Sequence, residues 1–119
     1  MKVLIADDSS LSRKLLLKAL PDALTAEVSQ AANGEEALAA YAAGLAEIIF
    51  LDLTMPVMDG FETLERLHRL DANAVVIVVS ADIQPQARQR VIELGAAAFI
   101  KKPISSEAMM ATLHEIGVL

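Results

Sequence analysis

Five polar side chains stand just after short apolar runs in this sequence: Asp7, Asp8, Asp52, Ser80 and Lys102. If these runs are neighbouring parallel strands, their carboxyl ends meet at one edge of a sheet, where α/β proteins bind ligands. Three carboxylates gathered there would repel one another by roughly 4 kcal/mol per pair, at about 4 Å and an effective dielectric of about 20. The pattern therefore predicts a cation at this edge.

Magnesium suits such a site, because it accepts one or two carboxylates, keeps several waters and leaves room for phosphate oxygens. Lys102 adds an ammonium group, and Ser80 adds a hydroxyl donor. A carboxylate nucleophile with these three neighbours has the parts that phosphoryl transfer requires. We predict that Asp52 is the phosphoryl acceptor, because an aspartate directly after Ile-Ile-Phe-Leu is half buried and costly unless paired.

Each residue alone also fits a simpler role. Asp7 and Asp8 fit the N-cap of a following helix, and Lys102 before Pro103 fits a surface turn. Ser80 alone says little, and Phe99 alone reads as a core residue. The joint pattern favours a functional site, since separate elements would otherwise deliver matching polar groups to one edge by accident.

The elements that must position these residues are visible as five apolar runs, near residues 3–6, 26–28, 48–51, 75–79 and 97–100. Four of them lack the alternation of a half-exposed sheet, which indicates parallel strands buried on both faces and joined by helices. We predict an α/β fold, a single (βα)₅ doubly wound parallel sheet. No repeat or linker interrupts it, so one domain is expected over residues 1–119.

Helix signals separate the runs. One helix is expected from Ser10 to Leu20, one from the Asn33 N-cap to Gly44, one after Asp59, one from Pro85 to Gly95 and one after Ser105. The third is expected to bury Phe61, Leu64, Leu67 and Leu70 on one face, and the last to bury Met109, Leu113 and Ile116.

Composition excludes several functions. Of 119 residues 55% are apolar, enough for one core, and the formal charge of −6 without a basic patch disfavours direct binding to nucleic acid. The absence of cysteine excludes disulfides and thiolate chemistry and fits a reducing compartment, so a cytoplasmic protein is expected. The first apolar run ends at Asp7, too early for a signal peptide, and no run is long enough to cross a membrane.

Over nearly its whole length the chain resembles the CheY-like response-regulator receiver family of two-component signalling. The motifs that carry the likeness are Asp7-Asp8, Asp52 with Met55-Pro56 and Asp59-Gly60, Ser80-Ala81, and Lys102-Pro103. The strand order 2-1-3-4-5 is implied by this resemblance.

The resemblance implies a role for each matching position. Asp52 would be phosphorylated by a histidine kinase or a histidine phosphotransfer protein, and Asp8 and Asp52 would bind Mg²⁺ directly. Asp7 would act mostly through a bound water, and the main-chain carbonyl of Thr54 would complete the protein ligands. Lys102 would hold a phosphate oxygen. The family positions Pro56, Gly60 and Pro103 would be structural, with a cis peptide before Pro103.

The same resemblance implies a switch. Phosphorylation would draw Ser80 and Lys102 inward and turn Phe99 behind them, changing the surface formed by the fourth helix, fifth strand and fifth helix. A protein target or an appended output domain would read that surface, for which Arg88, Arg90 and Met110 are candidates. The domain would be no enzyme beyond catalysing its own phosphorylation and dephosphorylation, and a monomer or a weak phosphorylation-dependent homodimer.

One departure from the family pattern and three rival functions remain. Thr54 and Asp82 occupy positions where the family tunes phosphoaspartate lifetime, so that lifetime is not predicted. An aspartate-nucleophile phosphatase of the haloacid dehalogenase type needs a second acid at position 54, where threonine stands, and a flavodoxin-like phosphate loop is opposed by Asp7 and Asp8. The stronger rival is a receiver-like interaction module that is never phosphorylated.

Overall fold

The structure is a computed structural model and describes residues 1–70, 72–81 and 84–119. Strands and helices alternate along these residues. They are β1 (Lys2–Ala6), α1 (Ser10–Ala19), β2 (Glu27–Ala31), α2 (Gly34–Ala42), β3 (Ile48–Leu51), α3 (Gly60–Arg69), β4 (Val75–Ser80), α4 (Pro85–Glu93), β5 (Ala98–Lys101) and α5 (Ser106–Glu115). A short 3₁₀ turn at Asp22–Leu24 precedes β2. The Asp82 position, where lifetime tuning was expected, lies outside the described residues.

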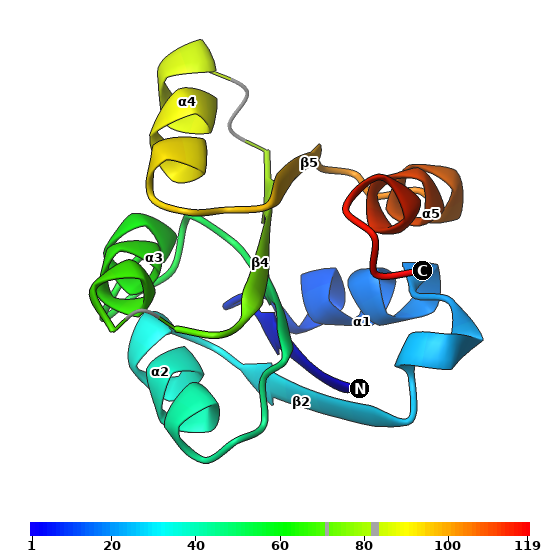
Figure 1. The fold of residues 1–119 in the computed structure, drawn as a ribbon, viewed down its shortest axis with the longest axis horizontal. Helices are drawn as coiled ribbons and strands as arrows, with labels where there is room; N and C mark the ends of the chain where they lie inside the picture. The colour runs from blue at the N-terminus through cyan, green and yellow to red at the C-terminus, as the bar shows by residue number, and fades with distance from the viewer. Residues whose placement is uncertain (71, 82–83) are drawn as a thin grey trace.

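The five strands form one parallel sheet in the order β2-β1-β3-β4-β5 (Figure 1). In its centre Ala6 pairs with Leu51, and Leu51 pairs with Val78, so the carboxyl ends of β1, β3 and β4 lie together. Helices α1 and α5 cover one face, and α2, α3 and α4 cover the other. The predicted α/β class, doubly wound topology and strand order are confirmed.

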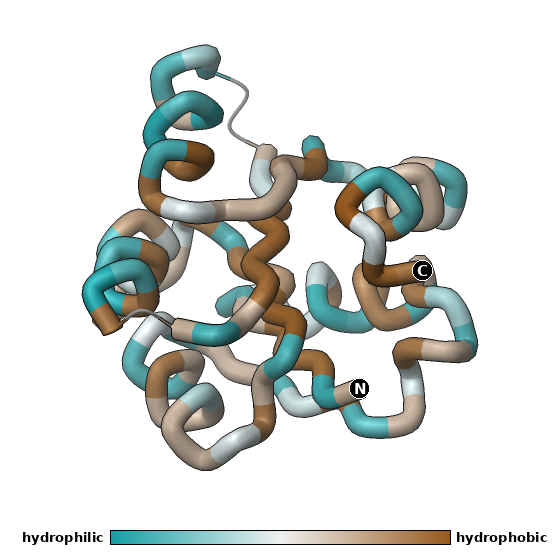
Figure 2. The backbone as a smooth tube through the Cα atoms, in the orientation of Figure 1, coloured by the Kyte–Doolittle hydropathy of each residue, from teal (hydrophilic) through white to brown (hydrophobic). Residues whose placement is uncertain are grey.

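Alternate residues of the strands face two separate cores, one on each side of the sheet. Figure 2 shows the strands as the apolar centre of the backbone. On the α1/α5 face, Val3 and Ile5 of β1 pack with Leu16, Met109 and Leu113. On the other face, Leu4 and Ala6 pack with residues of α2 and α3. Because both faces are covered, β1 and β3 read as continuous apolar runs.

Side-chain caps start four of the helices. Ser9, Asn33, Asp59 and Ser105 each accept a hydrogen bond from the main-chain N–H three residues later. The N-caps predicted at Asn33 and Asp59 are confirmed, and α4 instead begins with Pro85, whose fixed φ suits a first helical turn. These caps fix where each helix leaves the edge of the sheet that carries the polar residues.

One predicted helix face was wrong at its end. Leu64 and Leu67 are buried, but Leu70 is 63% exposed and stands after the last residue of α3. Leu70 follows Phe61 by nine residues, which at about 100° per residue places it roughly half a turn away from Phe61. A spacing of three residues drifts around a helix, so four residues separated by three such steps do not share one face.

Within the described ranges, none of the helices combines the length and the apolar character needed to cross a bilayer.

Candidate functional site

Three carboxylates meet at the carboxyl edge of the sheet. Asp7 and Asp8 follow β1, and Asp52 follows β3, its neighbour in the sheet. The Asp52 N–H donates to the carbonyl of Ala6 at 2.9 Å, which continues the ladder and holds Asp52 beside the end of β1. One carboxylate oxygen from each aspartate lies within 4.8 Å of the other two. Asp7 and Asp52 are buried and Asp8 is exposed.

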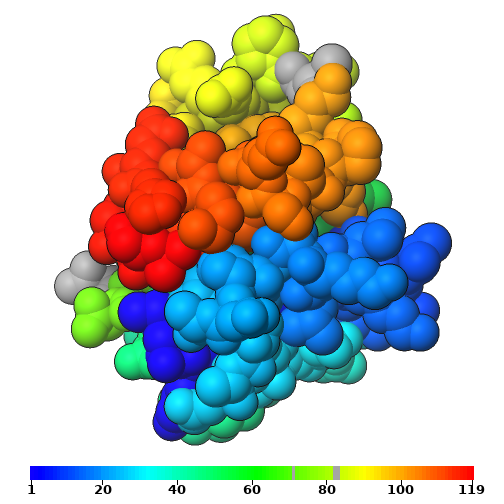
Figure 3. Space-filling model, turned by 90° about the vertical axis from the view of Figure 1, so that its right-hand side faces the viewer, coloured from blue at the N-terminus to red at the C-terminus, as the bar shows by residue number. Residues whose placement is uncertain are grey.

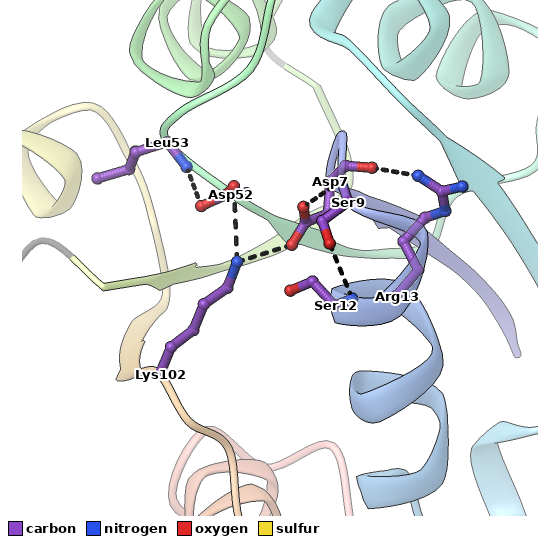
Figure 4. A network of polar contacts seen from close by, with 7 residues as sticks. All are labelled: Asp7, Ser9, Ser12, Arg13, Asp52, Leu53 and Lys102. Atoms are coloured by element: carbon purple, nitrogen blue, oxygen red, sulfur yellow. Dashed lines mark hydrogen bonds and ion pairs between the residues drawn. The ribbon is translucent and has the colours of Figure 1, made fainter.

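Lys102 brings a positive charge between two of these acids. Its Nζ donates to Asp7 Oδ2 at 2.8 Å and lies 3.6 Å from Asp52 Oδ2 (Figure 4). The main-chain N–H of Lys102 donates to the carbonyl of Ser80 at 2.9 Å, so β4 and β5 fix the base of the side chain. The neighbouring Lys101 is exposed, and the Lys102–Pro103 peptide is cis.

The carboxylate of Asp7 has a full set of partners. Oδ2 accepts from Lys102, and Oδ1 accepts from the main-chain N–H of Ser9 at 2.9 Å. Burial by itself would raise the pKa of Asp7, but hydrogen bonds from Lys102, Ser12 and Ser9, together with the lysine charge, outweigh it and lower the pKa. Asp7 is thus held ionised.

Asp52 has fewer partners. Its Oδ1 accepts from the N–H of Leu53 at 2.9 Å, and the main chain of Thr54 adds a weaker contribution. Burial raises the pKa of Asp52, and the negative charge of Asp7 adds to the rise, against the opposing charge of Lys102 at its longer distance. The Asp52 carboxylate is therefore the less stabilised anion of the pair.

The loop from β3 to α3 approaches Asp52 closely. A Cβ atom on Gly60 would lie 2.2 Å from the main-chain oxygen of Asp52, so only glycine fits where α3 begins. Val57 adopts φ of 67° and is 71% exposed, and the Met58 N–H donates to the carbonyl of Pro56 at 2.7 Å across this tight turn. Thr54 and Pro56 are exposed beside it.

The two residues predicted to switch lie on the β4–β5 side. Ser80 ends β4 and is 2% exposed, and its main-chain carbonyl binds Lys102. Phe99 lies on β5 and is half buried against the core under α4. The guanidinium of Arg88 in α4 lies over the Phe99 ring, 5.8 Å from its centroid.

The residues suggested for an output surface have defined neighbours as well. Arg90 lies over the ring of Phe61 at 4.4 Å from the centroid, so α4 is tied to α3 as well as to β5. Arg88 and Arg90 are exposed overall, and Met110 on α5 is half buried. A cation over an aromatic face contributes about 0.5–1 kcal/mol at exposed sites.

Sequence reasoning missed Arg13, which joins three elements. From the first turns of α1, its Nη1 donates to the carbonyl of Asp7 at 2.6 Å, and its Nε donates to Gln30 Oε1 of β2 at 2.7 Å. Figure 4 shows the guanidinium reaching back to the strand end. A basic residue in an amphipathic helix is normally predicted to lie on the solvated surface, so the sequence gives no signal for this contact.

An apolar groove of about 470 Å³ opens beside Lys102, between α1 and the segment after β5. Leu11 and Leu15 of α1 line it and are 65% and 53% exposed, and Pro103 and Ile104 form the other wall. Figure 3 shows this side of the molecule, where α1 and α5 lie next to each other. The groove therefore extends from the polar site onto the surface.

The carboxylate oxygens of Asp7, Asp8 and Asp52 are the ligands that a hard divalent cation prefers. Because Asp7 and Asp52 are buried, the repulsion between the carboxylates is costly when no cation is bound. The residues present thus fit Mg²⁺. A nucleophilic carboxylate next to a cation site and an ammonium group is suited to accept a phosphoryl group.

Comparison with known proteins agrees with this geometry. Residues 3–114 match the family described as response regulator receiver domain. The chain is 32% identical over 116 residues to the chemotaxis protein CheY of Thermotoga maritima, covering 98% of this chain and 97% of that one. It is 35% identical over 115 residues to CheY of Listeria monocytogenes, covering 97% of each.

Solved structures give the same result. The complex of CheX and CheY with BeF₃ and Mg²⁺ from Borrelia burgdorferi contains a chain that superposes with a TM-score of 0.88 at 34% identity, covering 98% of this chain and 89% of that chain. The CheY4 structure from Vibrio cholerae gives 0.84 at 32% identity, covering 97% of each. The protein belongs to the response regulator receiver domain family.

Proposed function

We propose that the protein is a phospho-acceptor switch, in which Mg²⁺-dependent transfer from a histidine kinase or a histidine phosphotransfer protein phosphorylates Asp52. The observation that carries the proposal is the contrast at the sheet edge. Asp7 is held ionised by Lys102 and Ser9, whereas Asp52 is buried with one short hydrogen bond and a raised pKa. A buried carboxylate with few partners is stabilised most when a cation or another positive group binds next to it.

In the proposed transfer, an oxygen of Asp52 attacks phosphorus as the bond from phosphorus to the donor nitrogen breaks. The donor imidazole, protonated on its other ring nitrogen, leaves neutral, and the product is an acyl phosphate on Asp52. Lys102 already stands 3.6 Å from Asp52 Oδ2 and would turn toward the new oxygens, and the Ser80 hydroxyl would donate to one of them. The protein would catalyse only its own phosphorylation and dephosphorylation.

The metal proposal follows from the donor set. Asp8 and Asp52 would bind Mg²⁺ directly, Asp7 would act through a water, and the Thr54 carbonyl would complete the protein ligands. When bound, the cation would neutralise charge that develops on the phosphoryl oxygens. The similar CheY of Borrelia burgdorferi was solved in a complex with CheX, BeF₃ and Mg²⁺, which supports Mg²⁺ as the metal.

The output would be a population shift of the α4–β5–α5 surface. The added phosphoryl charge would pull Ser80 and Lys102 inward, and Phe99 would rotate behind them. The present contact of Arg88 over the Phe99 ring holds this ring beside α4, so the rotation would release that part of α4. A protein target or an appended output domain would read the change, and the protein would remain a monomer or pair weakly when phosphorylated.

A phosphodonor protein must reach Asp52 across the surrounding surface. The groove lined by Leu11 and Leu15 adjoins Lys102 and offers an apolar contact surface beside the site. Exposed apolar patches of this kind mark interaction sites. The CheY relatives are chemotaxis proteins, which supports a signalling role. This role would be carried out in the cytoplasm, without direct contact to nucleic acid or membrane.

The test is phosphorylation by acetyl phosphate with and without Mg²⁺, followed by intact-mass spectrometry, with Asp52→Asn as the control. The proposal predicts a labile gain of one phosphoryl group that needs Mg²⁺ and is absent from the variant. A folded wild-type protein that binds Mg²⁺ but takes up no phosphoryl group would contradict it, and would favour an interaction module that works unphosphorylated.

A further inference from the structure

We propose that Arg13 is a positioning residue for the metal-binding carboxylates, through its bridge from α1 to the main chain of Asp7 and to Gln30 of β2. The proposal rests on the Mg²⁺ site proposed above. Its starting observation is the pair of short hydrogen bonds, 2.6 Å to the Asp7 carbonyl and 2.7 Å to Gln30 Oε1. One planar guanidinium makes both, which a flexible ammonium group would not reproduce.

The bridge acts at the point where β1 becomes a loop. The Asp7 N–H donates to the carbonyl of Ala31 in β2 at 2.9 Å, and the Asp7 carbonyl receives Arg13, which is itself bound to β2 through Gln30. The main-chain N–H of Asp7 is therefore hydrogen-bonded directly to β2, and its carbonyl is linked to the same strand through Arg13. The peptide plane between Asp7 and Asp8 is fixed as a result.

Asp8 depends on this plane more than Asp7 does. The Asp7 carboxylate is held directly by Lys102 and Ser9, whereas Asp8 is exposed and its carboxylate has no hydrogen bond or ion pair within residues 1–70, 72–81 and 84–119. Its oxygen nevertheless lies within 4.8 Å of those of Asp7 and Asp52. The main chain that Arg13 braces is what keeps the Asp8 oxygen in this position.

Geometry and charge predict opposite effects for the loss of Arg13, which makes the proposal testable. A guanidinium bound to the Asp7 carbonyl would repel a cation held at this edge, so its removal on electrostatic grounds alone would strengthen Mg²⁺ binding. Loss of the bridge would instead weaken binding, by about tenfold if it resembles the loss of other groups that orient metal ligands. The sign of the change separates the two effects.

The experiment measures the Mg²⁺ dissociation constant by isothermal titration calorimetry for the wild type, Arg13→Met, Arg13→Lys and Gln30→Ala. We expect Arg13→Met to bind about tenfold more weakly, Arg13→Lys to recover only part of this, and Gln30→Ala, which changes no charge, to lose about threefold. The matched control is Lys14→Met, which removes a neighbouring exposed charge on α1 and should bind at least as tightly as the wild type.

A second readout needs no metal. The Ser9 N–H, which donates to Asp7 Oδ1, should exchange with solvent faster in metal-free Arg13→Met and Gln30→Ala, while amides in the centre of β4 keep the wild-type rate. If Arg13→Met unfolds, Gln30→Ala carries the test. Unchanged or tighter Mg²⁺ binding by the folded variants, or unchanged Ser9 exchange, would overturn the proposal. A wild type that binds no Mg²⁺ would contradict the proposed function, and Ser9 exchange would then decide the bracing role of Arg13.

Discussion

Asp7 and Asp52 end adjacent parallel strands and both are buried, yet the structure shifts their pKa values in opposite directions. Desolvation raises the pKa of both groups. Asp7 overcomes it with Lys102 at 2.8 Å, the Ser9 amide at 2.9 Å and a further hydrogen bond from Ser12, while Asp52 has the Leu53 amide at 2.9 Å and Lys102 at the longer distance of 3.6 Å. The comparison teaches that hydrogen-bond partners, more than burial, separate the acid that organises the site from the acid that is available for chemistry.

The loops that carry the two acids differ in the same sense. The β1–α1 loop is held by the Ser9 cap and by Arg13, which crosses to β2. The β3–α3 loop passes Asp52 with Val57 in the left-handed region, where a β-branched residue is strained. Both loops are held by hydrogen bonds, since Asp59 caps α3 and the Gly60 N–H donates to the carbonyl of Leu53 at 2.9 Å, but the β3–α3 loop also keeps a strained backbone at Val57.

The variant with the largest expected effect removes the Lys102 ammonium group, which lies near both Asp7 and Asp52. Lys102→Met leaves Asp7 buried without its cation, and at pH 7 without Mg²⁺ we expect the free energy of unfolding to fall by about 3 kcal/mol. Because a bound cation replaces part of the lost charge, saturating Mg²⁺ should recover part of this loss. Urea denaturation with and without Mg²⁺ measures both values, and Lys101→Met, an exposed neighbour, is the control. An equal loss of unfolding free energy in Lys102→Met and Lys101→Met would mean that Asp7 does not depend on the charge of Lys102.

The next test removes the charge of the fully partnered acid. Asp7→Asn should lower the free energy of unfolding of the metal-free protein by about 1.5 kcal/mol at pH 7, because the ionised group receives charge-assisted hydrogen bonds. Since the pKa of Asp7 is lowered in the folded state, its contribution is present above the usual value of 3.8 and is lost as the pH falls below it. The difference between wild type and variant should therefore vanish in acid, as urea melts across pH will show.

The matching change at the other acid should have the opposite sign. Asp52→Asn should raise the free energy of unfolding of the metal-free protein by about 1 kcal/mol at pH 7, because the folded state disfavours the Asp52 anion. The gain should disappear as the pH falls through the raised pKa, above 3.8, where the wild type becomes neutral at this position. A loss of stability in Asp52→Asn, measured in the same urea series, would contradict the ranking of the two acids.

The smallest test concerns the strained loop. Val57→Gly relieves the left-handed backbone and removes an exposed side chain, but it also frees the unfolded chain. We expect a net gain in unfolding free energy of about 0.5 kcal/mol from thermal or urea denaturation. Val57→Ala, which keeps a Cβ in the same conformation, should show no such gain. Destabilisation of Val57→Gly by more than about 1 kcal/mol would mean that the turn is not strained.

Much of this scaffold could be predicted from the sequence, because strands covered on both faces are apolar throughout. The apolar runs that end at Ala6 and Leu51 predict β1 and β3, and hence the positions of Asp7 and Asp52. Strand order came from family resemblance, since apolar runs do not say which strands are neighbours. Pro103 indicated that Lys102, rather than Lys101, reaches the site, and the structure places its Nζ there.

Other features depend on distances that no spacing rule supplies. The opposite pKa shifts of Asp7 and Asp52 depend on their different partners. Asp7 accepts hydrogen bonds from Lys102 at 2.8 Å and from Ser9, whereas Asp52 lies 3.6 Å from the Lys102 ammonium and also faces the negative charge of Asp7. The bridge made by Arg13 requires the exact placement of Gln30 on another strand. Leu70 was assigned to the buried face because a run of three-residue steps was extended past the point where it leaves that face.

The most direct test of the central claim asks which carboxylate carries the phosphoryl group. Protein treated with acetyl phosphate and Mg²⁺ is reduced with borohydride, which converts an aspartyl phosphate to homoserine, and the modified residue is located by peptide mass spectrometry. We expect homoserine at position 52 and unmodified aspartate at positions 7 and 8. Homoserine at position 7 or 8, with Asp52 unmodified, would contradict it.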